Sequence, residues 1–246
     1  MDYIPTTEAE AQEMLRTIGV ASLEDLLSEI PSELRCKTLE LPGGLSEPEV
    51  LALASSLAGR NRSLDGTTSF LGFGAYHHVI PTVVDAVSAR GEWLTPYTPY
   101  QAEASQGTLQ MIYEFQTMVC ELMQMDLANA SLYDGASSLA EAAVMAVRMG
   151  ARARVLISEA VHPHARQVVA TYLSGFPCVL QDIPSVNGAT DLEALALAMQ
   201  EDVACVVMQQ PNVFGCLEPM AKASELAHRS GALFVAGVYP VSLGVL

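Results

Sequence analysis

The chain has 246 residues, half of them hydrophobic, and a formal net charge of −16. A polyanion of this kind repels nucleic acid and anionic membrane surfaces, so we expect neither as a partner. The sequence has no apolar stretch long enough to span a membrane, and its first residues lack the pattern of a secretory signal, which predicts a cytoplasmic protein. Its five cysteines lack the spacing of a metal knuckle, so no metal site is expected.

Residues 1–65 predict a helical N-terminal arm. Possible capping boxes begin short helices at Thr7, Ser22 and Ser46, because each of these hydroxyl residues is followed three positions later by an acidic residue. Proline and glycine interrupt the helical pattern at residue 31 and at 42–44. Short amphipathic helices cannot bury their apolar faces alone, so we expect the arm to pack on the main domain or on another subunit.

Residues 66–246 predict part of a large α/β domain. Helices are expected at 81–90 and 105–125, and beyond residue 126 short apolar strands alternate with helices. The expected strands are 130–133, 155–158, 178–182, 203–209 and 232–238, and the helices between them are 136–149, 164–174, 191–200 and 219–230. This alternation implies a mainly parallel sheet covered by helices on both faces. The chain stops a few residues after the last expected strand, so we expect a truncated piece of a longer subunit.

Residues 95–107 form the most informative motif, because they contain two Thr-Pro-Tyr triplets and lead into an expected long helix. The prolines hold the backbone near polyproline geometry and present Tyr97 and Tyr100 on a stiff loop. A phenol ring can stack on a planar cofactor and donate a hydrogen bond to a substrate. A proline-rich corner whose tyrosines serve packing alone fits the same residues equally well.

A second candidate site is the turn at residues 134–138, which joins an expected strand to an expected helix. Backbone N–H groups at a helix start can hold a phosphate, so the candidate cofactor-binding residues are Asp134, Gly135, Ala136 and Ser137. The Asp134 carboxylate argues against an anion, because it competes for the same N–H groups. A plain helix cap is the alternative.

Histidines are a third candidate. His162 and His164 follow the second expected strand, where α/β folds place their ligands, and either residue could contact a ligand or cap the next helix. Tyr76, with the two histidines after it, lies near a glycine-rich segment and could contact substrate. The chain has two lysines, Lys37 and Lys222, and neither lies where a Schiff-base lysine is expected, in a desolvated pocket at the ligand edge of the sheet.

The chain resembles the first (α) subunit of the two-subunit P-protein of the glycine cleavage system, which is glycine decarboxylase. The resemblance lies in residues 1–7, 70–81, 95–110 and 128–136. The resemblance covers nearly the whole chain. It implies the fold type I of pyridoxal-phosphate enzymes and an α2β2 assembly whose β subunit carries the pyridoxal 5'-phosphate and its lysine. It also implies that the complex decarboxylates glycine and passes the aminomethyl group to the lipoyl H-protein.

The resemblance implies that the α chain completes the catalytic site from across the subunit interface. The residues expected to form this α-side wall are Tyr97, Thr98, Tyr100 and Gln101. On the same grounds, the turn at residues 134–138 is a vestigial cofactor cup.

Two positions depart from the family pattern. Ala102 stands where the family usually has proline, so the loop is less rigid. Tyr239 stands at a strand end where the family usually has an aspartate that pairs with the pyridine nitrogen of the cofactor. Tyr239 cannot make that contact, and we therefore expect the cofactor pocket of this chain to be vestigial.

Two other functions remain open from the residues. One is a truncated stand-alone aminotransferase or decarboxylase that depends on pyridoxal phosphate. The missing lysine and Tyr239 count against it. The other is a non-catalytic scaffold that binds and regulates a paralogous enzyme. Substitution of Tyr97 and Tyr100 would separate a scaffold from a catalytic wall.

Overall fold

The computed structural model describes residues 5–36, 40–64, 66–93, 98–150 and 152–245. The chain divides into two compact units, Met1–Ser63 and Leu64–Leu246. The domain boundary expected between residues 65 and 66 stays a prediction, because compactness alone does not define a domain.

The first unit consists of short helices, and capping residues mark where α1 and α2 begin. Its elements are α1 (Glu8–Ile18), α2 (Leu23–Leu26), the 3-10 helix η1 (Ser32–Leu34) and α3 (Glu47–Ala58). The capping box at Thr7 is confirmed, since Thr7 Oγ1 accepts from the Glu10 N–H at 3.3 Å and Glu10 Oε2 accepts from the Thr7 N–H at 2.7 Å. Ser22 caps α2 in the same way. Among the described residues of this unit, Leu15 alone is buried, so hardly any tertiary packing supports these helices.

The second unit begins with α4 (Thr82–Ser88), the 3-10 helix η2 (Gly91–Trp93) and α5 (Gln106–Met123), and both expected helices are confirmed. None of the α5 residues is buried. The Gln116 amide donates to the Ala128 carbonyl at 2.7 Å, and α5 packs against the 3-10 helix η3 (Pro240–Gly244). Among the described helices, none combines the length and the hydrophobicity that a membrane crossing needs.

The strand expected at residues 130–133 is wrong. Ser131 has a φ of +107°, outside the extended region of an L-residue, and its N–H bonds the Asn129 side chain at 3.0 Å. This Asx turn gives the backbone a local hydrogen bond in place of a strand partner.

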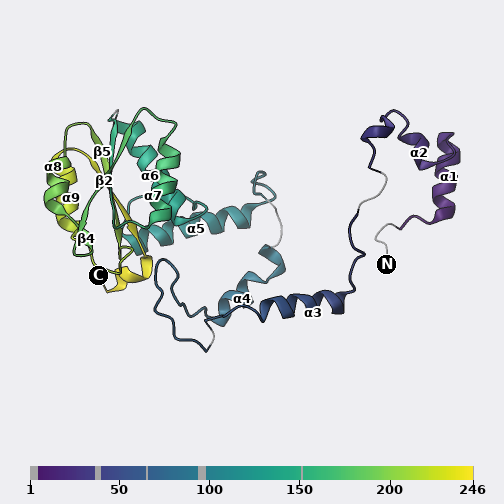
Figure 1. The fold of residues 1–246 in the computed structure, drawn as a ribbon, viewed down its shortest axis with the longest axis horizontal. Helices are drawn as coiled ribbons and strands as arrows, with labels where there is room; N and C mark the ends of the chain where they lie inside the picture. The colour runs from purple at the N-terminus through teal and green to yellow at the C-terminus, as the bar shows by residue number, and fades with distance from the viewer. Residues whose placement is uncertain (1–4, 37–39, 65, 94–97, 151, 246) are drawn as a thin grey trace. The chain divides into compact units, whose positions relative to one another are not determined.

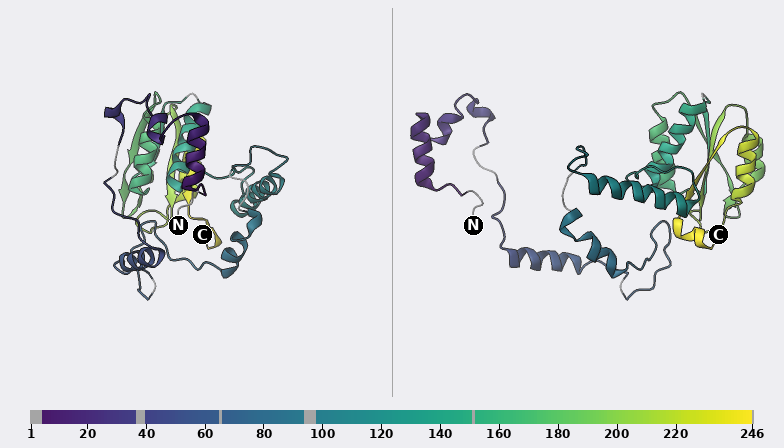
Figure 2. Two further views of the ribbon diagram at one scale, coloured as in Figure 1. Left: turned by 90° about the vertical axis from the view of Figure 1, so that its right-hand side faces the viewer. Right: turned by 180° about the vertical axis from the view of Figure 1, so that it is seen from behind.

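The rest of the unit is a parallel sheet between two helical layers (Figure 1). In chain order the main elements are α6 (Gly135–Gly150), β1 (Arg154–Ser158), α7 (Pro163–Leu173), β2 (Val179–Ile183), α8 (Leu192–Ala198), β5 (Val203–Gln210), α9 (Met220–Arg229) and β6 (Leu233–Val238). The strands lie in the order β2-β1-β5-β6 and all pair in parallel. Helices α6 and α7 cover one face and α8 and α9 the other, as Figure 2 shows from behind. The expected three-layer α/β fold is confirmed.

A small hairpin was not foreseen. Strand β3 (Ser185–Val186) pairs antiparallel with β4 (Ala189–Thr190). Strands of two residues are too short to show the alternation of apolar and polar residues by which a strand is recognised in a sequence.

Two apolar clusters hold the helical layers to the sheet. Val155 and Ile157 of β1 pack toward α6 and α7, and Leu156 between them packs toward α8 and α9. Along β5 the two clusters alternate from Cys205 to Met208, because successive side chains of a strand point to opposite faces. Ala204 and Cys205 both belong to the first cluster, beside the register shift between β1 and β5. A strand with both faces covered reads as a continuous apolar run, which is why β1 and β5 are recognisable in the sequence.

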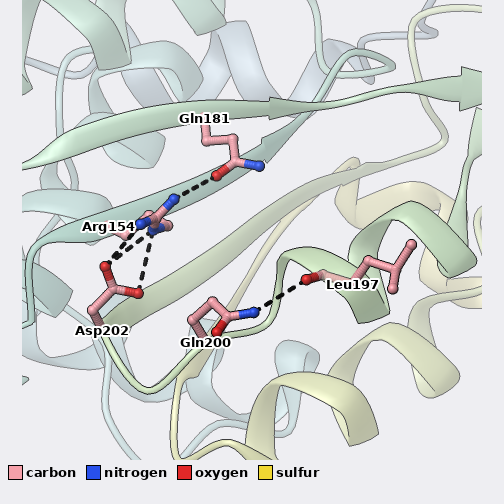
Figure 3. A network of polar contacts seen from close by, with 5 residues as sticks. All are labelled: Arg154, Gln181, Leu197, Gln200 and Asp202. Carbon is pink, nitrogen blue, oxygen red and sulfur yellow. Dashed lines mark hydrogen bonds and ion pairs between the residues drawn. The ribbon is translucent and has the colours of Figure 1, made fainter.

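Arginines tie together the edge of the sheet where the parallel strands begin. Figure 3 shows the Arg154 guanidinium between Asp202, at 3.0 Å, and the Gln181 side chain, at 2.9 Å. Nearby, Arg152 Nη1 donates to the carbonyls of Val203 at 3.0 Å and Ser230 at 2.9 Å. Side chains therefore fill the amino edge of the sheet, and a ligand site is expected at the opposite edge.

Candidate functional site

The strand order places a crevice at the carboxyl edge of the sheet. The chain leaves β1 toward β2 on one side and leaves β5 toward β6 on the other, and ligands of open α/β sheets bind where this direction reverses. A cavity of about 610 Å³ lies there, within the usual range for a small-molecule site. It is lined by the ends of β5 and β6, the first turns of α6 and α7, and Gly74 and Tyr76. Among the described residues no cluster of three or more histidine, cysteine or acidic side chains could hold a metal ion.

His162 is held on three sides where α7 begins. Its N–H donates to Gln209 Oε1 at 2.9 Å, and its ring Nδ1 accepts from the N–H of His164 at 3.2 Å. The ring also lies against Phe73, with centroids 4.4 Å apart. Both histidines line the cavity, and His162 is at the same time the N-cap of α7. The ligand-contact and helix-cap alternatives are therefore compatible at this position.

Tyr239 follows β6 and lines the same cavity. Its ring packs against Tyr76, with centroids 5.1 Å apart, and its hydroxyl lies 2.6 Å from Nε2 of His78. The segment that contains Tyr76 and His78 therefore lies over the sheet edge and contacts the end of β6, more than 150 positions later in the chain. Tyr239 is therefore engaged by residues of this chain, and its replacement of a family aspartate stays a prediction.

The turn at residues 134–138 begins α6 at the cavity wall. Asp134 Oδ1 accepts the N–H of Ser137 at 2.7 Å, and this backbone hydrogen bond lowers the pKa of Asp134. Gly135 and Ala136 line the cavity, whereas Ser137 does not. The carboxylate takes one of the free N–H groups of the helix start and adds a negative charge there, both of which oppose an anion. Phosphate binding by this turn stays a prediction.

The described residues 98–101 of the Thr-Pro-Tyr loop do not line the cavity. Tyr97 is outside the described residues, and Thr98, Tyr100 and Gln101 are exposed, the Tyr100 side chain to 90%. These three described residues are absent from the cavity wall. Within this chain, the structure therefore does not bring the expected catalytic wall together with the ligand edge of the sheet.

Sequence reasoning missed the polar residues that end β5. Gln209 and Gln210 line the cavity, and the loop after them contains the buried polar residues Asn212 and Glu218. The signal was present as two glutamines that end an apolar strand and precede a Pro-Asn pair. Polar residues at the carboxyl end of a buried parallel strand are where a ligand contact is expected.

The cavity does not suit a covalently bound pyridoxal phosphate. None of its described lining residues is a lysine, an arginine or a carboxylate. Its described lining therefore offers no lysine amine for the aldehyde, no lysine or arginine for the phosphate and no carboxylate for the pyridine nitrogen. Lys222 lies exposed on α9, away from the cavity, and Lys37 is outside the described residues.

Comparison with known proteins gives a consistent answer along the whole chain. The family model for the glycine cleavage system P-protein matches residues 1–246. A probable glycine dehydrogenase (decarboxylating) subunit 1 of Geobacillus kaustophilus is 51% identical over 245 residues, which are 99% of this chain and 55% of that protein. The corresponding protein of Moorella thermoacetica is 49% identical, over 100% of this chain and 55% of its own length. The chain spans about half the length of the curated relatives it matches.

Solved structures agree with the sequence relatives. The crystal structure of an inhibitor-bound glycine decarboxylase, the P-protein of the glycine cleavage system, superposes with a TM-score of 0.87 at 46% identity, covering 100% of this chain and 55% of that one. A sphingosine-1-phosphate lyase of Burkholderia pseudomallei, 17% identical with a TM-score of 0.58 over 83% of this chain and 50% of its own, shares the fold alone. With matches of sequence and structure over its full length, the chain belongs to the glycine cleavage system P-protein family.

Proposed function

We propose that this chain is part of the α subunit of a glycine decarboxylase and acts with a second, lysine-bearing β subunit. The reaction converts glycine and the lipoyl H-protein to CO2 and the aminomethyl-lipoyl H-protein. The pyridoxal phosphate is held mainly by the β subunit, and none is bound covalently by this chain. We propose an α2β2 assembly in the cytoplasm.

One observation carries this proposal. The whole chain matches a glycine decarboxylase P-protein with a TM-score of 0.87, yet the cavity at its own ligand edge lacks a lysine among the described lining residues. The cavity of this segment therefore needs an amine from outside the described residues, and we propose that a partner subunit supplies it. The relatives are named as subunit 1 of a glycine dehydrogenase (decarboxylating), which supports the proposal of a second subunit.

The role of this chain in the reaction is to bind, orient and exclude water. The loop at residues 98–101 offers an exposed phenol at Tyr100 and an amide at Gln101, which can close a site on another subunit. Helix α5 follows this loop and exposes apolar side chains along its length, among them Met111, Met118 and Leu122. Large exposed apolar surfaces mark interaction sites, which supports a subunit interface here. We propose that residues 1–65 form an arm that packs in this assembly, and that residues 66–246 form part of its large domain.

The proposal is tested by reconstitution. The chain is prepared alone and together with the lysine-bearing subunit, and release of labelled CO2 from carboxyl-labelled glycine is measured with lipoyl H-protein present. We expect activity only when both subunits are present, and no borohydride-reducible pyridoxal adduct on the isolated chain. Turnover by the isolated chain, or an adduct on Lys37 or Lys222, would contradict the proposal.

Tyr100 separates a catalytic wall from a scaffold. In the assembly, Tyr100→Ala is expected to lower kcat/KM at least about tenfold, the loss expected when a contact worth about 1.4 kcal/mol to the transition state is removed. The thermal midpoint of the isolated chain should not change, because this side chain is exposed there. The matched control is Tyr172→Ala on α7, another exposed tyrosine. Full activity of Tyr100→Ala in an intact assembly would favour a non-catalytic scaffold.

A further inference from the structure

The loop at residues 211–218 crosses the ligand edge of the sheet, and two buried polar side chains hold it. The side chain of Asn212 is 1% exposed and that of Glu218 is 8% exposed. A buried polar group stabilises a fold only when its hydrogen bonds are satisfied, so the partners of these two residues show what they hold in place.

Glu218 joins three segments of the chain. Its Oε1 accepts from Nδ2 of Asn212 at 2.7 Å, and its Oε2 accepts from the N–H of Thr190, in β4, at 2.9 Å. Its own backbone N–H donates to Oε1 of Gln210 at 2.7 Å. Both oxygens of this buried carboxyl group are satisfied, and the backbone of residue 218 is fixed against the end of β5.

Asn212 completes the network from inside the loop. Its Oδ1 accepts from the N–H groups of Phe214 and Cys216, each at 3.0 Å, and its Nδ2 donates to the carbonyl of Gly188 at 2.7 Å as well as to Glu218. The amide therefore uses both of its ends and ties the loop to the β3–β4 hairpin. Neither the loop nor the hairpin can shift without breaking several buried hydrogen bonds.

This network fixes the orientation of the Gln210 amide. The Glu218 N–H is a donor, so the atom that faces it must be the oxygen of the amide, and a flipped amide would place an N–H against an N–H. Nε2 is then directed away from residue 218, and Gln210 lines the cavity. Within the described chain, Nε2 of Gln210 has no hydrogen-bond partner, whereas the neighbouring Gln209 bonds with both ends of its amide, to His162 and to Pro211.

We propose that Gln210 is a fixed hydrogen-bond donor to a carbonyl or carboxylate oxygen of a ligand in this cavity, and that Glu218 and Asn212 are its positioning residues. An N–H donor without a partner selects an oxygen acceptor, and an amide held in one orientation loses little conformational entropy on binding. The inference concerns the cavity of this chain alone and does not depend on the proposed reaction.

The positioning part is tested by NMR on the full 246-residue chain. The side-chain N–H2 pair of Gln210 is assigned by its disappearance in Gln210→Glu, and exchange of the backbone N–H of residue 218 is measured. Glu218→Gln places an amide where two donors need acceptors, so exchange at residue 218 should be at least about tenfold faster, as expected from the loss of hydrogen bonds of order 1 kcal/mol each. The Gln210 pair should shift or broaden. The matched control Glu225→Gln, on the exposed side of α9, should change neither signal.

A variant of Gln210, at the other end of the hydrogen-bond network, provides a second test if Glu218→Gln does not fold. Gln210→Met removes the acceptor of the Glu218 N–H and leaves Glu218 in place. Exchange at residue 218 should then increase while the N–H of Thr190, bonded to the Glu218 carboxyl group, stays protected. Unchanged exchange at residue 218 in either variant, or equal loss of protection at both positions in Gln210→Met, would overturn the positioning role.

The donor part is tested with flat probes that carry a single acceptor group, neutral benzamide and its anionic analogue benzoate. Either probe should shift the Gln210 N–H2 pair, and the stronger one tells whether the cavity favours a neutral or a charged oxygen. Gln210→Glu and Glu218→Gln should weaken the stronger probe at least about fivefold, as expected for one hydrogen bond of about 1 kcal/mol. Gln167→Glu, on the exposed side of α7, should leave its affinity unchanged. A Gln210 pair that neither probe moves would overturn the donor assignment, whatever the outcome of the reconstitution.

Discussion

The sheet at residues 154–238 and the helices that precede it are stabilised in different ways. Leu156 of β1 is fully buried between the sheet and its helices, whereas Leu122 of α5 is 76% exposed. The strands exist because neighbouring strands and two helical layers cover them. Before residue 124, side-chain caps begin α1 and α2, whereas α4 and α5 have no side-chain cap hydrogen bond, and the apolar faces of these helices are largely exposed in this chain.

This difference distinguishes a packed core from helices whose apolar faces are exposed in this chain. A helix gains most of its stability from burying its apolar face, and an isolated short helix is marginal in water. Helices with exposed apolar side chains are therefore expected to depend on a covering surface. A covering surface is what the proposed second subunit supplies, and the following predictions test the contrast.

The largest effect is expected in the core. Leu156→Ala should lower the free energy of unfolding by about 3 kcal/mol, since it removes a fully buried side chain and leaves a cavity. Leu122→Ala should change it by less than about 0.5 kcal/mol, because the side chain is already in water. Urea unfolding of the isolated chain, followed by far-UV circular dichroism, measures both. Equal costs would mean that α5 is packed in solution and that the contrast is wrong.

A smaller effect is expected at the amino edge of the sheet. Gly231 has a φ of +67°, and a Cβ at this position would lie 3.0 Å from Nη2 of Arg152. Gly231→Ala should therefore lower the free energy of unfolding by about 1–2 kcal/mol, through backbone strain and displacement of the guanidinium. Gly175→Ala, where a Cβ would meet open space, is the control and should change stability little. A cost at Gly175 equal to that at Gly231 would contradict the assigned cause.

The helical arm should respond locally. Thr7→Ala removes the side-chain acceptor of the Glu10 N–H and should destabilise α1 by about 1 kcal/mol. Hydrogen exchange in α1 should become faster, while the unfolding midpoint of the sheet stays the same. A parallel shift of both would show that arm and sheet unfold as one unit, and the contrast between them would then be a matter of degree.

The smallest effect is a dependence on pH at the start of α6. The hydrogen bond from the Ser137 N–H lowers the pKa of Asp134 below its ordinary value of 3.8. The resulting stability is present in full above that value and is lost as the pH falls through the lower pKa of the folded state. Asp134→Asn should reduce this loss between pH 4 and more acidic values, with Asp126→Asn as an exposed control that caps no helix. Identical acid unfolding of Asp134→Asn and the unmodified chain would show that the cap contributes nothing.

Much of the fold could be predicted because its signals are local. Strands β1 and β5 are apolar runs buried on both faces, and the helices between strands show their periodicity and their caps. The false strand at residues 130–133 and the missed β3–β4 hairpin arise where a turn and a two-residue pairing decide the backbone. Neither leaves an apolar pattern of its own.

The candidate site was predictable in part for the same reason. His162 and His164 follow β1 directly, so their place at the ligand edge is implied by the strand that precedes them. Two other features could not be predicted: the contact between Tyr239 and His78, and the hydrogen bonds that link Gln210, Glu218 and Asn212. No pattern in the sequence around these residues indicates which of them pair. Their partners depend on how loops cross the sheet edge.

The amino-acid sequence by itself indicated the family and the alternation of strands and helices, and it predicted a stiff loop that contains Tyr100. Each of these features depends on residues that are close together in the sequence. Only the tertiary structure decided that Tyr100 lies away from the cavity, that Asp134 occupies the start of α6, and that a buried carboxyl group orients the Gln210 amide. These features depend on distances between segments far apart in the chain, and such distances are determined by the packing of the whole sheet.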